Sequence, residues 1–140
     1  VTQELTNAMA KNEFGLIVVN YANPDMVGHT GCLKAAIEAV ETVDQCVGRV
    51  VESVLDHDGT MFLTADHGNC EVMFDEKRGI PHTAHTTNLV PTILINAPRN
   101  VAHLKPGKLA DVAPTILDLM SIPKPKIMTG SSLLSLNRVV

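Results

Sequence analysis

One long amphipathic stretch between two short apolar runs most constrains the fold of this chain. From about Cys32 to Leu55, apolar residues recur every three or four positions and polar residues fill the other face, which predicts a helix with one buried side. The runs 14–20 and 60–65 are short, apolar and rich in β-branched residues, as strands covered on both faces are. Strand, covering helix and strand form a βαβ unit with parallel strands and a right-handed crossover. The apolar row of the helix is Leu33, Ile37, Val40, Val43, Val47, Val50 and Val54.

The rest of the chain extends this pattern. Residues 2–11 are typical of the end of a helix, and the polar, Pro- and Gly-containing stretch 20–31 is typical of a loop. Residues 92–95 predict a third strand, and Asp111 is the expected N-cap of a second helix. The inward positions of that helix are expected to be Ile116, Leu117 and Met120. We therefore predict an α/β fold with a mostly parallel sheet, flanking helices and an extended tail.

Composition excludes several classes of function. The chain has 140 residues, the length of one domain, and a formal charge of −4 does not favour a nucleic-acid partner. No apolar run approaches the roughly 20 residues of a membrane-spanning helix. Three cysteines leave at least one unpaired, and Cys32 and Cys46 would lie about 21 Å apart on the predicted helix, too far for a disulfide. A reducing, cytoplasmic location is therefore expected.

Candidate metal ligands follow the predicted strands. Asp25 and His29 lie in the loop after the first strand, and Asp66 and His67 come directly after the second. The polar excursion 66–88 also contains His82 and His85. Because the carboxyl ends of parallel strands meet at one sheet edge, these carboxylates and imidazoles should converge there. They are ligands that Zn²⁺, Mn²⁺ or Fe²⁺ prefers.

The alternatives differ in how many metals this set can hold. A single Asp at a strand end is more often a cap, and a single His more often a surface residue, but four of the six histidines lie in these loops. Two metals would need about six ligands, and spacing alone does not choose between His82 and His85. No Ser or Thr stands out as a nucleophile, and no Arg cluster could clamp a phosphate. The incomplete set, and an opening without Met inside a helix, predict a piece of a larger enzyme.

Three loop motifs carry a resemblance to a known family. They are Asn-Tyr-Ala-Asn-Pro-Asp-Met-Val-Gly-His-Thr-Gly at 20–31, Thr-Ala-Asp-His-Gly-Asn at 64–69 and Pro-His-Thr-Ala-His-Thr-Thr at 81–87. Together they strongly resemble the cofactor-independent (2,3-bisphosphoglycerate-independent) phosphoglycerate mutases of the alkaline phosphatase superfamily. The stretches 109–120 and 128–134 look like the C-terminus of the same family.

The resemblance implies a site and an activity. By it, Asp25, His29 and His85 would bind one Mn²⁺, and Asp66 and His67 would bind a second, with His82 in a supporting role. Residues 1–140 would be the C-terminal part of the phosphatase-like domain. The nucleophilic Ser, one more Asp ligand and the substrate-binding domain would lie outside this chain. The full enzyme would interconvert 3-phosphoglycerate and 2-phosphoglycerate in glycolysis through a phosphoserine intermediate.

Two other interpretations remain at this point. Phosphopentomutase and other metal-dependent phosphatase relatives share the Asp-His-Gly stretch, although residues 68–71 and 86–91 look more like the mutase. A non-catalytic metal-binding module that exposes the same loops is the alternative from another class.

Overall fold

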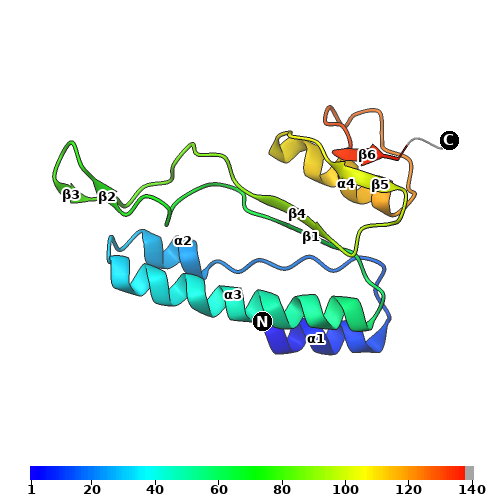
Figure 1. Ribbon diagram of the computed structural model, residues 1–140, viewed down its shortest axis with the longest axis horizontal. Helices are drawn as coiled ribbons and strands as arrows, with labels where there is room; N and C mark the ends of the chain where they lie inside the picture. The colour runs from blue at the N-terminus through cyan, green and yellow to red at the C-terminus, as the bar shows by residue number, and fades with distance from the viewer. Residues whose placement is uncertain (138–140) are drawn as a thin grey trace. The chain divides into compact units, whose positions relative to one another are not determined.

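The chain divides into two compact units. The computed structural model describes residues 1–137, so the last three residues of the predicted 1–140 domain lie outside it. Unit 1 comprises residues 1–59 and 67–90, and unit 2 comprises residues 60–66 and the chain from residue 91 onward. Unit 1 contains the long helix and a small hairpin, whereas unit 2 contains two longer strand pairs and a shorter helix (Figure 1).

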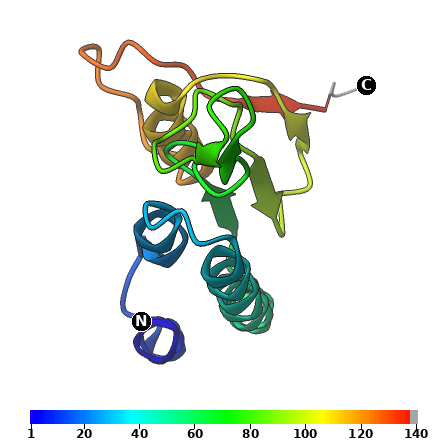
Figure 2. The ribbon, with the colours of Figure 1, turned by 90° about the vertical axis from the view of Figure 1, so that its left-hand side faces the viewer.

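Unit 1 is organised around the long helix. Its elements are α1 (Thr2–Lys11), α2 (Asn23–Gly28), α3 (Leu33–Asp56), β2 (Phe74–Asp75) and β3 (Ile80–Pro81). Both α1 and α2 pack beside α3, as the two ribbon views show (Figures 1 and 2). The strands β2 and β3 form an antiparallel hairpin within residues 67–90, the excursion of unit 1 that contains nearly all of the predicted polar stretch 66–88. The helix predicted from Cys32 to Leu55 is confirmed to within one residue at each end.

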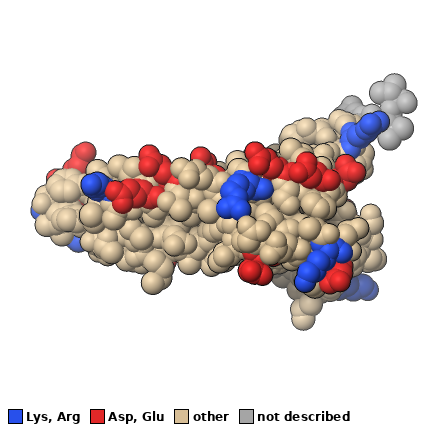
Figure 3. Space-filling view, turned by 90° about the horizontal axis from the view of Figure 1, so that it is seen from below, with Lys and Arg blue, Asp and Glu red and all other residues tan. Residues whose placement is uncertain are grey.

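The apolar row of α3 is buried along only part of its length. Val50 and Val54 are buried, as is Leu5 of α1, whereas Leu33 and Ile37 are 57% and 49% exposed. The expectation that the whole row is core is therefore wrong for the N-terminal half of the helix. Figure 3 shows a face on which charged side chains lie along the upper edge, near the centre and at the lower right, with a broad area without charge toward the left. None of the helices in residues 1–137 is long and apolar enough to cross a membrane.

The first predicted strand does not form. Residues 14–20 have no strand assignment, and Val18 is 84% exposed. A strand needs a neighbour to pair with its backbone N–H and C=O groups, and no strand among residues 1–137 pairs with this segment. The predicted βαβ unit is therefore not completed within the described chain.

The loop predicted at 20–31 contains a short helix that the sequence did not reveal. Helix α2 has Pro24 in its first turn, where the missing N–H of proline costs no helical hydrogen bond. Six residues are too few to produce a recognisable helical period. This helix matters because it carries the first two candidate ligands.

Unit 2 is built on antiparallel strand pairs. Its elements are β1 (Met61–Thr64), β4 (Thr92–Ile95), β5 (Val101–Leu104), the 3-10 turn η1 (Leu109–Asp111), α4 (Val112–Leu119) and β6 (Leu134–Leu136). Strand β1 pairs with β4, with Phe62 opposite Leu94, and β5 pairs with β6. Every strand pair within residues 1–137 is antiparallel, so the expected parallel pairing is absent from this part of the chain.

Asp111 does not cap α4 through its side chain. Its carboxylate instead accepts hydrogen bonds from the backbone N–H groups of Ser131 and Lys108, at 2.8 and 2.9 Å. The Thr115 hydroxyl, fully buried, donates to the Asp111 carbonyl and accepts from the Leu133 N–H. These contacts fasten the segment before β6 to the start of α4. Ile116 and Leu117 are half-buried as expected, but Met120 is exposed.

Candidate metal centre

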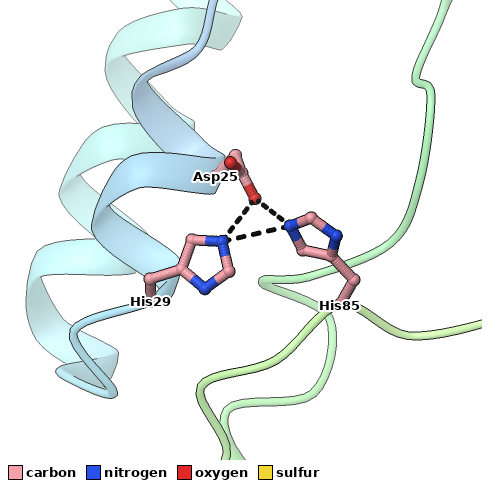
Figure 4. Close-up of side chains that lie close together, drawn as sticks. All are labelled: Asp25, His29 and His85. Atoms are coloured by element: carbon pink, nitrogen blue, oxygen red, sulfur yellow. Dashed lines mark hydrogen bonds and ion pairs between the residues drawn. The ribbon is translucent and has the colours of Figure 1, made fainter.

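Three side chains from two distant parts of the sequence converge in unit 1. Figure 4 shows Asp25, His29 and His85 pointing toward one another. The Asp25 Oδ1 atom lies 3.2 Å from His29 Nε2 and 3.0 Å from His85 Nε2. The two Nε2 atoms are 3.1 Å apart. One carboxylate oxygen and two imidazole nitrogens therefore form a compact triangle of donor atoms.

Local structure accounts for how these residues meet. Asp25 and His29 are four residues apart, so α2 and its C-cap place both side chains on one helical face. His85 reaches them from the excursion 67–90, where the Thr86 N–H donates to the Gly68 carbonyl at 2.9 Å. This contact closes the excursion and fixes the position of the residue before Thr86.

The donor triangle fits a divalent metal. Metal–ligand bonds of about 2.0–2.2 Å place neighbouring ligand atoms roughly 3–3.4 Å apart, as these three are. The other ring nitrogen of His29, Nδ1, lies 2.7 Å from the Thr83 carbonyl oxygen. An Nδ1–H that donates to a backbone carbonyl leaves the lone pair on Nε2, which is how metal-binding histidines are oriented. The three side chains are 34% to 47% exposed, so the centre is open to solvent.

Asp25 is held in its ionised form. The Asn69 side-chain amide donates to Asp25 Oδ1 at 2.7 Å, and this hydrogen bond is the main reason why the pKa of Asp25 is lowered. The imidazoles of His29, His85 and His67 lower it further. The carboxylate is therefore available to a cation throughout the neutral pH range.

The other predicted ligands lie outside this triangle. His67 stacks on His85, with ring centroids 3.6 Å apart, and its Nε2 lies 3.9 Å from Asp25 Oδ1. Asp66 belongs to unit 2 and is exposed. The buried Nδ1 of His82 has no hydrogen-bond partner among the described residues. In residues 1–137, the compact group of three donors is Asp25, His29 and His85.

Sequence reasoning missed the polar residues that surround the triangle. Asn69 is buried and contacts Asp25, and the Glu71 carboxylate accepts from the side chains of Thr86 and Asn88. The sequence signal for Glu71 was its position, four residues after His67 in a loop already rich in candidate ligands. The Cys70 thiol donates to the Pro24 carbonyl, and burial raises its pKa, so it fits the expected packing role rather than a ligand role.

Comparison with known proteins identifies the class. Residues 1–124 match the family model described as "Metalloenzyme: Metalloenzyme superfamily". The chain therefore belongs to the metalloenzyme superfamily. Family membership and the donor triangle together indicate a divalent metal in this part of the molecule.

Individual relatives carry a more specific name. The chain is 58% identical over 134 residues to a protein of Syntrophotalea carbinolica, and 53% identical over 135 residues to one of Clostridium botulinum. Both are named 2,3-bisphosphoglycerate-independent phosphoglycerate mutase. Each match covers 96% of this chain but 26% of the relative, so the chain spans about a quarter of their length.

A solved structure has the same fold. It is described as Leishmania mexicana phosphoglycerate mutase at low cobalt concentration, and it matches with a TM-score of 0.87 and 30% identity. The match covers 97% of this chain and 28% of that one. It confirms the predicted α/β, alkaline-phosphatase-like fold class, although the pairings within residues 1–137 are antiparallel.

Proposed function

We propose that this chain is the C-terminal, metal-binding part of a 2,3-bisphosphoglycerate-independent phosphoglycerate mutase, a cytoplasmic enzyme of glycolysis. The whole enzyme would interconvert 3-phosphoglycerate and 2-phosphoglycerate through a phosphoserine intermediate. The observation that carries the proposal is the Asp25–His29–His85 triangle in a chain whose relatives bear that name. The nucleophilic serine and the substrate-binding domain would belong to the part of the relatives that this chain does not span.

The triangle is the proposed binding site of one Mn²⁺. Thr83 orients the ring of His29 through its carbonyl, and Asn69 holds the Asp25 carboxylate toward both imidazoles. Bound divalent ions would neutralise charge on the transferring phosphoryl group and lower the pKa of the nucleophile. The exposure of all three ligands suits a centre that must admit a substrate phosphate.

Asp66 and His67 are the proposed half of a second Mn²⁺ site. His67 stacks on His85, which supports a position beside the first metal. With two ligands from this chain, the second site would need further ligands from the rest of the enzyme, since a catalytic metal usually takes at least three protein ligands. The chain alone should therefore bind one Mn²⁺ more tightly than any other.

The test separates the binding part from the active enzyme. The purified chain should bind Mn²⁺ but show no turnover of 3-phosphoglycerate, because removing the group that forms the covalent intermediate abolishes nearly all catalysis. A longer protein that contains this chain should convert 3-phosphoglycerate without added bisphosphoglycerate. Activity of the chain alone would contradict the proposal that the nucleophilic serine lies in another part of the enzyme. Transfer between positions of a pentose phosphate by the longer protein would favour the phosphopentomutase alternative.

A further inference from the structure

We propose that Glu71 is a positioning residue for the metal centre, acting through Asn69 and Thr86 rather than as a ligand. The inference rests on the metal site proposed above. It assigns to Glu71 the role of joining the two ends of the excursion 67–90, outside its hairpin, so that His85 meets Asp25 in the binding geometry.

Both oxygens of the Glu71 carboxylate accept hydrogen bonds, and the donors come from both sides of the excursion. One oxygen, Oε2, accepts from the Asn69 backbone N–H at 2.6 Å. The other, Oε1, accepts from the Thr86 hydroxyl and from the Asn88 side-chain amide, the latter at 3.0 Å. Because both oxygens accept from protein donors and Glu71 is not part of the compact donor group of residues 1–137, we treat it as a positioning residue and not as a metal ligand.

On one side, hydrogen bonds connect Glu71 through Asn69 to Asp25. The same Asn69 whose backbone donates to Glu71 also donates its side-chain amide to Asp25 Oδ1. Asn69 is 6% exposed and lies against Gly28 of α2, where a side-chain carbon would collide with its amide group. The packing thus leaves Asn69 little freedom, and Glu71 fixes its backbone.

On the other side, Glu71 contacts Thr86, which lies next to one of the two stacked histidines. Thr86 directly follows His85, and Gly68 directly follows His67. The Thr86 N–H donates to the Gly68 carbonyl, and a side-chain carbon at Gly68 would collide with both Thr86 and Glu71. Glu71 therefore packs over the point where the two segments join, one residue from each stacked imidazole.

The experiment compares Glu71→Ala, Glu71→Gln and the control Glu76→Ala. Glu76 is an exposed carboxylate in the same excursion, so its loss removes the same charge without touching the hydrogen bonds of Glu71. A glutamine can still accept from the Asn69 N–H through its carbonyl and donate to the Thr86 hydroxyl through its amide, and it loses only the hydrogen bond from the Asn88 amide. Mn²⁺ affinity is measured by calorimetric titration of the whole chain, and the ligand field is read from the visible absorption of bound Co²⁺. Ring resonances of His67 and His85 are recorded without metal.

Glu71→Ala should weaken Mn²⁺ binding by about 10–100-fold, as loss of a group that orients metal ligands does. Its Co²⁺ spectrum should change and the ring resonances should shift. Glu71→Gln should recover most of the affinity and Glu76→Ala should match the parent chain. Equal affinities and unchanged ring resonances in Glu71→Ala would overturn the proposal. If the parent chain binds no Mn²⁺, the metal-site proposal fails by itself, and the ring resonances alone then decide whether Glu71 positions the histidines.

Discussion

Two aspartates in this molecule have lowered pKa values for different reasons. Asp111 in unit 2 is buried, and its two carboxylate oxygens accept from the backbone N–H groups of Ser131 and Lys108. Asp25 in unit 1 is partly exposed and accepts from one side-chain amide, while its other near neighbours are imidazole nitrogens. Backbone N–H groups therefore satisfy both oxygens of Asp111 with hydrogen bonds. The Asp25 carboxylate instead lies beside imidazole nitrogens, which can also offer lone pairs.

The difference separates a structural carboxylate from a ligand. Donors from the backbone are permanent, so Asp111 has its hydrogen bonds in the folded chain and needs no ion. Carboxylate and neutral imidazole groups that converge on one point are all electron-pair donors, and a cation satisfies them together. Substitutions in the two regions should therefore change different observables: metal affinity around Asp25, and stability around Asp111.

The largest effect is expected at His85. His85→Ala should lower Mn²⁺ affinity by at least about 100-fold, because it removes a proposed direct ligand and not only a residue that orients one. His82→Ala is the matched control and should cost less than His85→Ala, since His82 lies outside the donor triangle. Titration of Mn²⁺ into both variants decides the assignment. If His82→Ala loses the metal and His85→Ala retains it, the assignment of the two histidines is reversed.

Acidification should weaken metal binding before it affects Asp25. Because the pKa of Asp25 is lowered from 3.8, this carboxylate stays ionised as the pH falls through the weakly acidic range. Protons then compete with the metal for ring nitrogens, so affinity should fall on acidification while Asp25 is still ionised. Mn²⁺ titrations at several pH values test this. An affinity that does not change with pH would exclude imidazole ligands.

In unit 2, Thr115 should control stability and leave metal binding unchanged. Thr115→Val keeps the shape but leaves the Leu133 N–H without its buried acceptor, which should cost about 1–3 kcal/mol of unfolding free energy. Thr115→Ser retains the hydroxyl and should cost less. Urea unfolding and Mn²⁺ titration of the same samples measure both effects. If either Thr115 variant changed the Mn²⁺ affinity, stability around Asp111 and metal binding around Asp25 would not be independent.

The smallest effect is expected from Asp111→Asn in acid. Because the pKa of Asp111 is lowered in the folded chain, its contribution to stability is complete above its usual pKa of 3.8 and is lost as the pH falls through the lowered value. The asparagine variant lacks this titration, so its unfolding free energy should change less steeply with pH in that acidic range. The difference in slope should correspond to at most about one bound proton. Urea unfolding at several acidic pH values provides the measurement. If the unfolding free energies of the parent chain and the variant changed equally with pH, the role assigned to Asp111 would be contradicted.

Elements with a strong local signal could be predicted from the sequence. The helix α3 follows from a long apolar period, and the strands at 61–64 and 92–95 lie within their predicted bounds. The segment 14–20 failed because strand formation depends on a partner, which the apolar run itself does not specify. The strands β5 and β6 were not predicted because Val101–Leu104 and Leu134–Leu136 are each interrupted by a polar residue, whereas the segments that form β1 and β4 contain uninterrupted apolar runs.

The candidate site was predictable in its residue types but not in its geometry. The motifs at 20–31 and 81–87 drew attention to Asp25, His29 and His85, yet spacing could not separate His85 from His82. That distinction depends on which ring the fold turns toward Asp25. The supporting residues were hidden for the same reason, because Asn69 and Glu71 act through hydrogen bonds across 44 and 15 positions of the chain.

The position of the proposed ligands along the chain gives the metal a topological role. His29 and His85 are 56 residues apart, so an ion that binds both closes a loop of that length, whereas Asp25 and His29 close a single helical turn. By the estimate used for disulfides, such a closure removes about 4 kcal/mol of conformational entropy, as TΔS, from the unfolded chain. The ion would then act as a cross-link, and its removal should make residues 29–85 more accessible to proteases even where the folded contacts are unchanged.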